Sequence, residues 1–421
     1  MTSWKTHITD LIKRIHRRKG TPILPPGERI EIDIAERQDR QLLLDLAAEH
    51  GPIFKGTLEN KLGICIVGLS LGKRFLKEHA DNLQASNIDI SRVVSGGFMR
   101  QMQGDVHRHY RRMLMAALLP DGFVVRDDLT RQSMSRLLNQ YADTGDYSSE
   151  SWQRTLNTLI TELLIQVLLG FDPQSRQGQL IYDAYNKLGP YGLVWNLTEA
   201  QFSAFAQIRS LVERTIDAKE VNASCLLGRL LAQPDFDAAM LGNLIYMTEM
   251  GRYDMQTYFR WLSRYAALNQ PALLLARRST QGDSLLMRSF VLEVLRTDQS
   301  ERLMRRCLSD IEFEGFLFPK DTIVRICMWE AHHDAAVFPA PLRFQADRFA
   351  ADKIHHERFS PFGLDRHQCP FSELVIRLAS TFLQTLGDYE FSATGDGAPV
   401  RGAYHWEPAT DFSLQLARLQ H

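Results

Sequence analysis

The sequence is poor in the features that mark several large classes of protein. Its five cysteines are an odd number without regular spacing, which argues against a disulfide framework and indicates a reducing compartment. No apolar run approaches the ~20 residues that a membrane-spanning helix needs, and the N-terminus lacks the apolar core of a secretory signal. The formal net charge of −1 gives no sign of nucleic-acid binding. We therefore expect a cytoplasmic protein with neither a transmembrane anchor nor a nucleic-acid partner.

Helical periodicity dominates the middle of the chain, from about residue 104 to residue 297. Its longest helical run is 238–268, and at 1.5 Å per residue a continuous helix of this length would span about 45 Å. Short strand-like segments lie in the first ~100 residues and again after residue 297, including a predicted hairpin over 310–326. The pattern predicts a mainly α fold with a long central helix and small β-sheets, in one domain over 1–421. A nucleotide-binding sheet is not indicated, because neither a G-x-G-x-x-G nor a Walker loop is present.

Two local patterns have competing interpretations. The segment that ends at Lys19 has apolar residues at helical spacing beside basic ones, as in a helix that packs on its own protein or rests on an anionic membrane surface. We favour packing on its own protein.

The stretch GLSLG, 68–72, matches the G-x-S-x-G elbow of hydrolases. Only two short strand candidates precede Ser70, so we predict a simple strand-to-helix turn there.

Cys369 lies in a stretch that suits a thiolate. The sequence FGLDRHQCPF ends a polar, cationic turn, and Pro370 is at home in the first turn of the helix predicted over 371–386. The positive end of a helix and the neighbouring Arg366 and His367 favour the charged form of a thiol. The alternative is a buried structural cysteine.

Three motifs occur in a fixed order in the C-terminal half of the chain. They are the E-x-x-R of Glu293 and Arg296, the aromatic and arginine cluster PLRFQADRF that contains Arg348, and the F-G-x-x-x-H-x-C loop that ends at Cys369. The second and third lie about 50 and 75 residues beyond the first. In this order and spacing the sequence resembles the cytochrome P450 family of heme-thiolate enzymes.

The resemblance implies heme b as the cofactor, with Cys369 as the axial thiolate and metal ligand. Phe362 would pack against the heme near the sulfur. Several cationic residues would pair with the two heme propionates, since buried carboxylates need donors: His107, Arg111, Arg305 and His367. A structural triad of charges would hold the cysteine loop and take no part in chemistry: Glu293, Arg296 and Arg348.

The long helix departs from the family pattern at the place of its acid and threonine. Counting back from Pro271 places Asp254 at the acid position and Met255 at the threonine position. The resemblance therefore assigns catalysis to Asp254, Met255 and Cys369. The proton-relaying acid is retained, whereas the hydroxyl is lost, because methionine offers only a weak acceptor.

Arg252 and Tyr253, with Met255, would face the substrate. Arg252 is expected to pair with an anionic group of the substrate, such as a carboxylate. The alternative is that its side chain points away from the heme and forms an ion pair inside the protein, for example near Glu249.

Further residues near the motifs depart from the family or suggest metal ligands. Asp365 stands where the family most often has glycine, and Phe371 stands where a small residue usually follows, so Phe371 is expected to crowd the proximal heme face.

The pairs His332-His333 and His355-His356 lack the four-ligand spacing of a zinc site. We predict solvated loop histidines.

The implied function is heme-dependent oxidation of a small organic substrate, by hydroxylation or a related tailoring reaction, in secondary metabolism. Oxygen would be the oxidant, and electrons would come from a ferredoxin or flavodoxin with its reductase. The enzyme is expected to be a monomer. Because Met255 replaces the usual threonine, the alternative is a peroxide-driven or non-oxygen-reducing heme-thiolate enzyme. A second alternative is a non-catalytic heme protein that binds ligands.

Overall fold

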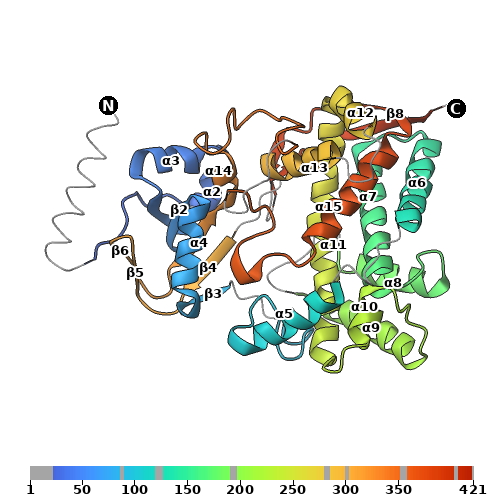
Figure 1. The fold of residues 1–421 in the computed structure, drawn as a ribbon, viewed down its shortest axis with the longest axis horizontal. Helices are drawn as coiled ribbons and strands as arrows, with labels where there is room; N and C mark the ends of the chain where they lie inside the picture. Colours follow the sequence, from blue (N-terminus) through green and yellow to red (C-terminus); the bar gives the residue numbers. More distant parts are fainter. Residues whose placement is uncertain are drawn as a thin grey trace. The chain divides into compact units, whose positions relative to one another are not determined.

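A computed structural model describes most of the chain (Figure 1). The described residues are 22–85, 90–118, 127–189, 197–278, 285–298, 303–350, 358–402 and 406–419. The predicted N-terminal amphipathic helix lies outside them. The chain forms two compact units, each assembled from segments far apart in sequence. Unit 1 is Met1–Asn87, Leu292–Cys369 and Pro399–Glu407, and unit 2 is Ile88–Val291, Pro370–Ala398 and Pro408–His421.

Unit 1 is built on a mixed five-stranded sheet in the order β1-β2-β7-β4-β3. β2 and β7 run parallel, and the other neighbouring strands run antiparallel. Alternating apolar side chains give the sheet its buried faces. Four short helices accompany it: α2, α3, α4 and α14. The bounds are β1 Ile53–Leu58, β2 Lys61–Val67, β3 Leu83–Ala85, β4 Leu303–Cys307, β7 Ile323–Cys327, α2 Ile32–Ala35, α3 Leu42–His50, α4 Leu69–Glu78 and α14 Met328–His332.

The predicted GLSLG turn is present in unit 1, whereas the hairpin predicted over 310–326 forms only in its first part, because Ile323–Cys327 is strand β7 of the five-stranded sheet. The hairpin pairs β5 (Ile311–Phe313) with β6 (Phe316–Phe318) across Glu314 and Gly315, which both have positive φ, as a tight hairpin turn requires. Gly68, at φ +115°, ends β2 and begins α4. The sheet is mainly antiparallel, so the parallel sheet that a hydrolase elbow needs is not there.

Unit 2 is mainly helical, and its 31-residue helix α11 contacts both α7 and α15 (Figure 1). α11 covers Ala238–Leu268, the same bounds as the predicted helix. The Asp237 side chain begins it by accepting the Met240 N–H at 2.8 Å. The other helices are α5 Gly104–Leu118, α6 Asp127–Thr144, α7 Ser149–Leu164 with its π-helical end η2 Ile165–Leu169, α8 Arg176–Asn186, α9 Glu199–Asp217, α10 Leu226–Leu231, α12 Gln270–Arg278 and α15 Ser372–Leu386.

Helix α13, Leu285–Thr297, contributes residues to both units. Two further two-stranded sheets are present. One pairs β8 (Tyr389–Thr394) antiparallel with β11 (Ser413–Arg418), and the other pairs β9 (Pro399–Arg401) with β10 (Trp406–Pro408). The fold is therefore mainly α with small sheets, as predicted. Among the described helices, none combines the length and hydropathy needed to cross a membrane.

Asn243 of α11 holds the loop that precedes α5. Its Oδ1 accepts the Met99 N–H at 2.7 Å, and its Nδ2 donates to Gly97 O at 3.2 Å and to Ala239 O at 2.9 Å. The side chain is fully buried. The Phe98 ring packs edge-on against Tyr246 one turn further along α11, at 4.9 Å between centroids. This loop is therefore fixed to the long helix by both polar and aromatic contacts.

Replacing Asn243 by leucine is expected to free this loop. The substitution removes the acceptor of a buried N–H group, so the free energy of unfolding should fall by about 1–3 kcal/mol. Urea unfolding and hydrogen exchange of a peptide over 96–102 would measure the two effects. The exposed Asn82, changed to alanine, is the control and should alter neither. Unchanged exchange over 96–102 in Asn243→Leu would show that the loop does not depend on this contact.

Candidate active site

Cys369 differs from the other four cysteines in exposure. Cys65, Cys225, Cys307 and Cys327 are buried, whereas Cys369 is half-buried. Burial raises the pKa of the Cys307 thiol to about 12 and also raises that of Cys225. These buried thiols behave as core residues. Cys369 is the cysteine that a ligand could reach.

The loop before Cys369 has a defined backbone. The Cys369 N–H donates to Phe362 O at 2.8 Å, which closes the loop into a compact turn. Gly363 has φ +86°, a conformation that glycine adopts without a Cβ clash. The Arg366 guanidinium donates to Ala80 O at 3.1 Å and ties the loop to the segment before β3.

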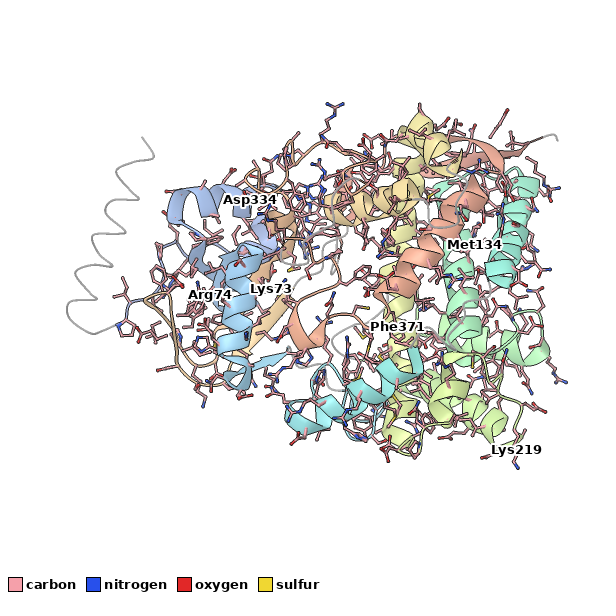
Figure 2. The ribbon with its side chains drawn as sticks, viewed as in Figure 1. Lys73, Arg74, Met134, Lys219, Asp334 and Phe371 are labelled. Carbon is pink, nitrogen blue, oxygen red and sulfur yellow. The ribbon has the colours of Figure 1, made fainter. Side chains whose placement is uncertain are left out.

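Asp365 occupies a left-handed conformation, with φ +61°. This is the position where the family most often has glycine, and aspartate is one of the few other residues that tolerate such a φ. Asp365 O also accepts the Gln368 N–H at 3.0 Å. The departure from glycine therefore leaves the turn possible. Figure 2 marks Phe371, the second departure, at the N-terminal end of α15, where it is half-buried. That it crowds a heme stays a prediction.

Glu293, Arg296 and Arg348 form the charge cluster that the sequence predicted. Arg296 donates to both carboxylate oxygens of Glu293, from Nε at 2.7 Å and from Nη2 at 2.9 Å. Arg348 Nε lies 3.0 Å from the same two oxygens. Glu293 and Arg296 have no exposed surface. The carboxylate is thus paired twice, as a buried charge requires.

The triad also fixes the backbone that follows the sheet. Arg296 Nη1 donates to His332 O at 2.9 Å and to Pro341 O at 2.8 Å. Arg348 donates to Pro339 O at 2.8 Å. Glu293 Oε1 accepts the Gln345 N–H at 2.9 Å. These four backbone groups are therefore held by one buried ion cluster, which supports a structural role for it.

The prediction that His332 and His333 are solvated loop residues is wrong. His332 ends the short helix α14, and both rings are buried. Burial lowers the pKa of His332 to about 3 and that of His333 to about 2. Both imidazoles are therefore neutral. Within the described residues no group of three or more His, Cys, Asp or Glu residues could hold a metal ion, while His355-His356 lies outside them.

The predicted propionate partners lie on separate elements. Arg305 is buried on β4, where its Nη1 donates to Met304 O at 2.8 Å, and His367 lies in the short 3₁₀ turn η3, Asp365–His367. His107 and Arg111 are one turn apart on α5 and so share a helix face. Their pairing with propionates stays a prediction.

Arg252 forms an internal ion pair, the alternative that the sequence left open. Its Nε and Nη2 donate to the two carboxylate oxygens of Glu249 at 2.8 and 2.9 Å. Nη1 donates to Asn157 Oδ1 at 2.9 Å, and Nη2 also donates to Gly189 O. Arg252 and Glu249 are each 2% exposed. Burial raises the pKa of Glu249, and Arg252 opposes that rise. The geometry therefore disfavours a substrate carboxylate as the partner of Arg252.

The other predicted residues of α11 differ in burial. Tyr253 and Met255 are buried, whereas Asp254 is half-buried. A half-buried carboxylate can exchange protons with solvent. It is therefore better suited to relay protons than a fully buried carboxylate would be. The substrate and catalytic assignments of these three residues stay predictions.

Comparison with known proteins finds cytochrome P450 relatives. The family model described as Cytochrome P450 matches residues 281–386. Abscisic acid 8'-hydroxylase 1 of Arabidopsis thaliana is 23% identical over 350 residues, covering 75% of this chain and 73% of the plant protein. Putative cytochrome P450 120 of Synechocystis sp. is 25% identical over 382 residues, covering 80% and 83%.

Solved structures show the same fold. The retinoic acid bound cyanobacterial CYP120A1 aligns with a TM-score of 0.73 at 20% identity, over 95% of this chain and 100% of that chain. Cytochrome P450EX alpha with myristic acid aligns with a TM-score of 0.72 at 16% identity, over 95% and 100%. The chain therefore has the fold of the heme-thiolate oxidoreductases. The family model, the curated relatives and the aligned structures are all cytochrome P450 proteins, and the enzymes of that family bind heme b.

The chain's own residues are compatible with that cofactor. The half-buried cysteine at the end of a closed loop could serve as a thiolate ligand of heme iron, one of the side chains that proteins use for this purpose.

Substitution of Arg252 distinguishes its structural role from substrate binding. Arg252→Met leaves the Glu249 carboxylate buried without its cation, so the free energy of unfolding should fall by about 3–5 kcal/mol. The double variant Glu249→Leu/Arg252→Met removes both charges and should recover most of that loss. Urea unfolding measures both effects. A stable double variant that no longer binds a carboxylic acid ligand would instead return Arg252 to the substrate site.

Proposed function

We propose that this protein binds heme b through the Cys369 thiolate and oxidises a small, mainly apolar organic molecule. The observation that carries the proposal is the half-buried cysteine at the end of a closed loop. The buried Glu293–Arg296–Arg348 cluster supports it, because it fixes the adjoining backbone. One domain over 1–421, a monomeric state and a cytoplasmic location belong to the same proposal.

The bound heme would supply the oxidising chemistry, and the chain's residues would control its surroundings. Cys369 would donate electron density from the thiolate sulfur. Phe362 would cover the sulfur side with an apolar ring and exclude water. His107, Arg111, Arg305 and His367 would neutralise the propionates.

Protons would reach the reacting centre by way of Asp254. Its half-buried carboxylate can take a proton from solvent and pass it inward. Met255 cannot continue the path, because a thioether has no proton to donate. The next donor would then be a water molecule or a hydroxyl of the substrate itself.

The proposed substrate is an apolar molecule with a carboxylate. The names of similar proteins support this class: relatives from Arabidopsis thaliana and rice are abscisic acid 8'-hydroxylases, and two aligned structures hold retinoic acid and myristic acid. Because Arg252 is already paired, the carboxylate would be recognised by another group. Electrons would come from a ferredoxin or flavodoxin with its reductase, and the reaction would belong to secondary metabolism.

A peroxide-driven reaction is the second candidate, and the buried Met255 favours it. An enzyme that uses peroxide does not need the protons that a threonine hydroxyl would help to deliver. A heme protein that binds ligands without turnover is the remaining alternative, and it predicts no product with either oxidant.

The reduced carbonyl spectrum of the purified protein tests Cys369. We expect a strongly red-shifted band, because a thiolate on iron donates more electron density than a histidine or a thiol. Cys369→Ser should lose that band. Cys225→Ser is the matched control, since its side chain accepts the Gly228 N–H at the start of α10 and serine can do the same. A band at the ordinary histidine-type position in the unsubstituted protein would contradict the proposal.

Met255→Thr separates the two oxidants. Adding the hydroxyl should raise product formation with oxygen and a redox partner by about 10-fold or more, within the range of positioned proton transfer. Peroxide-supported turnover should stay the same or fall. Product per electron consumed and product per peroxide consumed are the measurements. The contrary outcome is that the unsubstituted protein forms nearly one product for each pair of electrons consumed, with no higher yield in the variant. That result would show that the missing hydroxyl does not limit the enzyme.

A further inference from the structure

His332 makes contacts in two directions within unit 1. Its backbone oxygen accepts a hydrogen bond from Arg296 Nη1 at 2.9 Å. Its side-chain Nε2 accepts the backbone N–H of Ser360 at 3.1 Å. The first contact is made by an arginine of the charge triad. The second is made at the start of the segment 358–369 that leads to Cys369, which we call the cysteine loop. One buried residue therefore links the two.

Ser360 carries the link onward to Cys369. Its Oγ donates to Gly363 O at 2.5 Å, which folds the first half of the loop. The next residue back, Phe362, accepts the Cys369 N–H at 2.8 Å, which closes the second half. The orientation of Ser360 thus affects both halves of the loop. Ser360 is buried, so its N–H has no access to bulk water.

The imidazole of His332 is suited to a fixed acceptor. Because Nε2 accepts, the ring proton lies on Nδ1 and the ring is neutral. Burial first, and the Arg296 charge second, hold the pKa of His332 at about 3. A protonated ring would have two donors and no acceptor. The Phe359 ring, tilted at 5.0 Å, and the Phe338 ring, edge-on at 6.4 Å, restrict its rotation.

We propose that His332 is a positioning residue for the Cys369 sulfur, and that it acts through the Ser360 N–H. This inference rests on the proposed thiolate ligation by Cys369. Loss of the acceptor would leave a buried N–H unpaired, and the loop would relax until water or another group satisfied it. The thiolate would then be held less firmly and would convert more readily to the thiol.

Two substitutions of His332 separate the acceptor from the packing. His332→Phe keeps a ring and removes the acceptor. His332→Gln restores an acceptor, because its Oε1 lies the same number of bonds from Cβ as Nε2. We expect the reduced carbonyl complex of His332→Phe to lose its red-shifted band about 10-fold faster, and hydrogen exchange over 358–369 to rise about 10-fold, as expected for a lost buried hydrogen bond. His332→Gln should restore both.

His333→Phe is the matched control. His333 is buried on the same helix, where it stacks on Trp329 at 4.0 Å and its Nδ1 lies 2.8 Å from Trp329 O. This variant should lose stability and keep a stable red-shifted band. Equal band loss in His332→Phe and His333→Phe, or no rescue by His332→Gln, would overturn the inference. If the unsubstituted protein lacks the red-shifted band, the proposed function fails, and unchanged exchange in His332→Phe would separately show that His332 does not hold the loop.

Discussion

The local order of unit 1 depends on one carboxylate that has no access to water. Desolvation of a lone carboxylate at the depth of Glu293 would cost several kcal/mol, and the charges of Arg296 and Arg348 compensate for that cost. With both arginines present, the remaining guanidinium donors are free to bind backbone oxygens. Pro339, Pro341 and His332 are held in this way. The main effect of these charges is therefore to fix the positions of the backbone groups. Their net contribution to the free energy of unfolding is expected to be small, as is often found for buried ion pairs.

Much of the fold follows from local sequence. The helix over 238–268 is capped by Asp237, and Pro271 follows its end, so its bounds agree with those of α11. The Gly68 turn and the hairpin at Gly315 are set by glycines with positive φ. The order of the motifs also indicated the Glu293 cluster, although its backbone partners could not be derived from spacing.

The parts that sequence reasoning missed depend on contacts between distant segments. Arg252 meets Asn157 and Gly189, which are 95 and 63 residues away, so its internal pairing could be raised only as an alternative. His332 and His333 stand in a short polar run next to Asp334, yet both are buried: the rings of Phe338 and Phe359 pack against His332, and His333 stacks on Trp329. The φ of Asp365 likewise depends on the closed loop around it.

The sheet of unit 1 has a consequence for synthesis of the chain. β2 pairs with β7, and Gly63 and Ile323 are about 260 residues apart. At roughly 5–20 residues per second, a ribosome needs on the order of 13 to 50 s to make the chain between them. Through that interval β2 has only β1 as a partner, and its other edge has a row of unpaired backbone groups. Until β7 is made, the segments synthesised meanwhile must cover that edge, or it is open to pairing with a strand of a neighbouring chain.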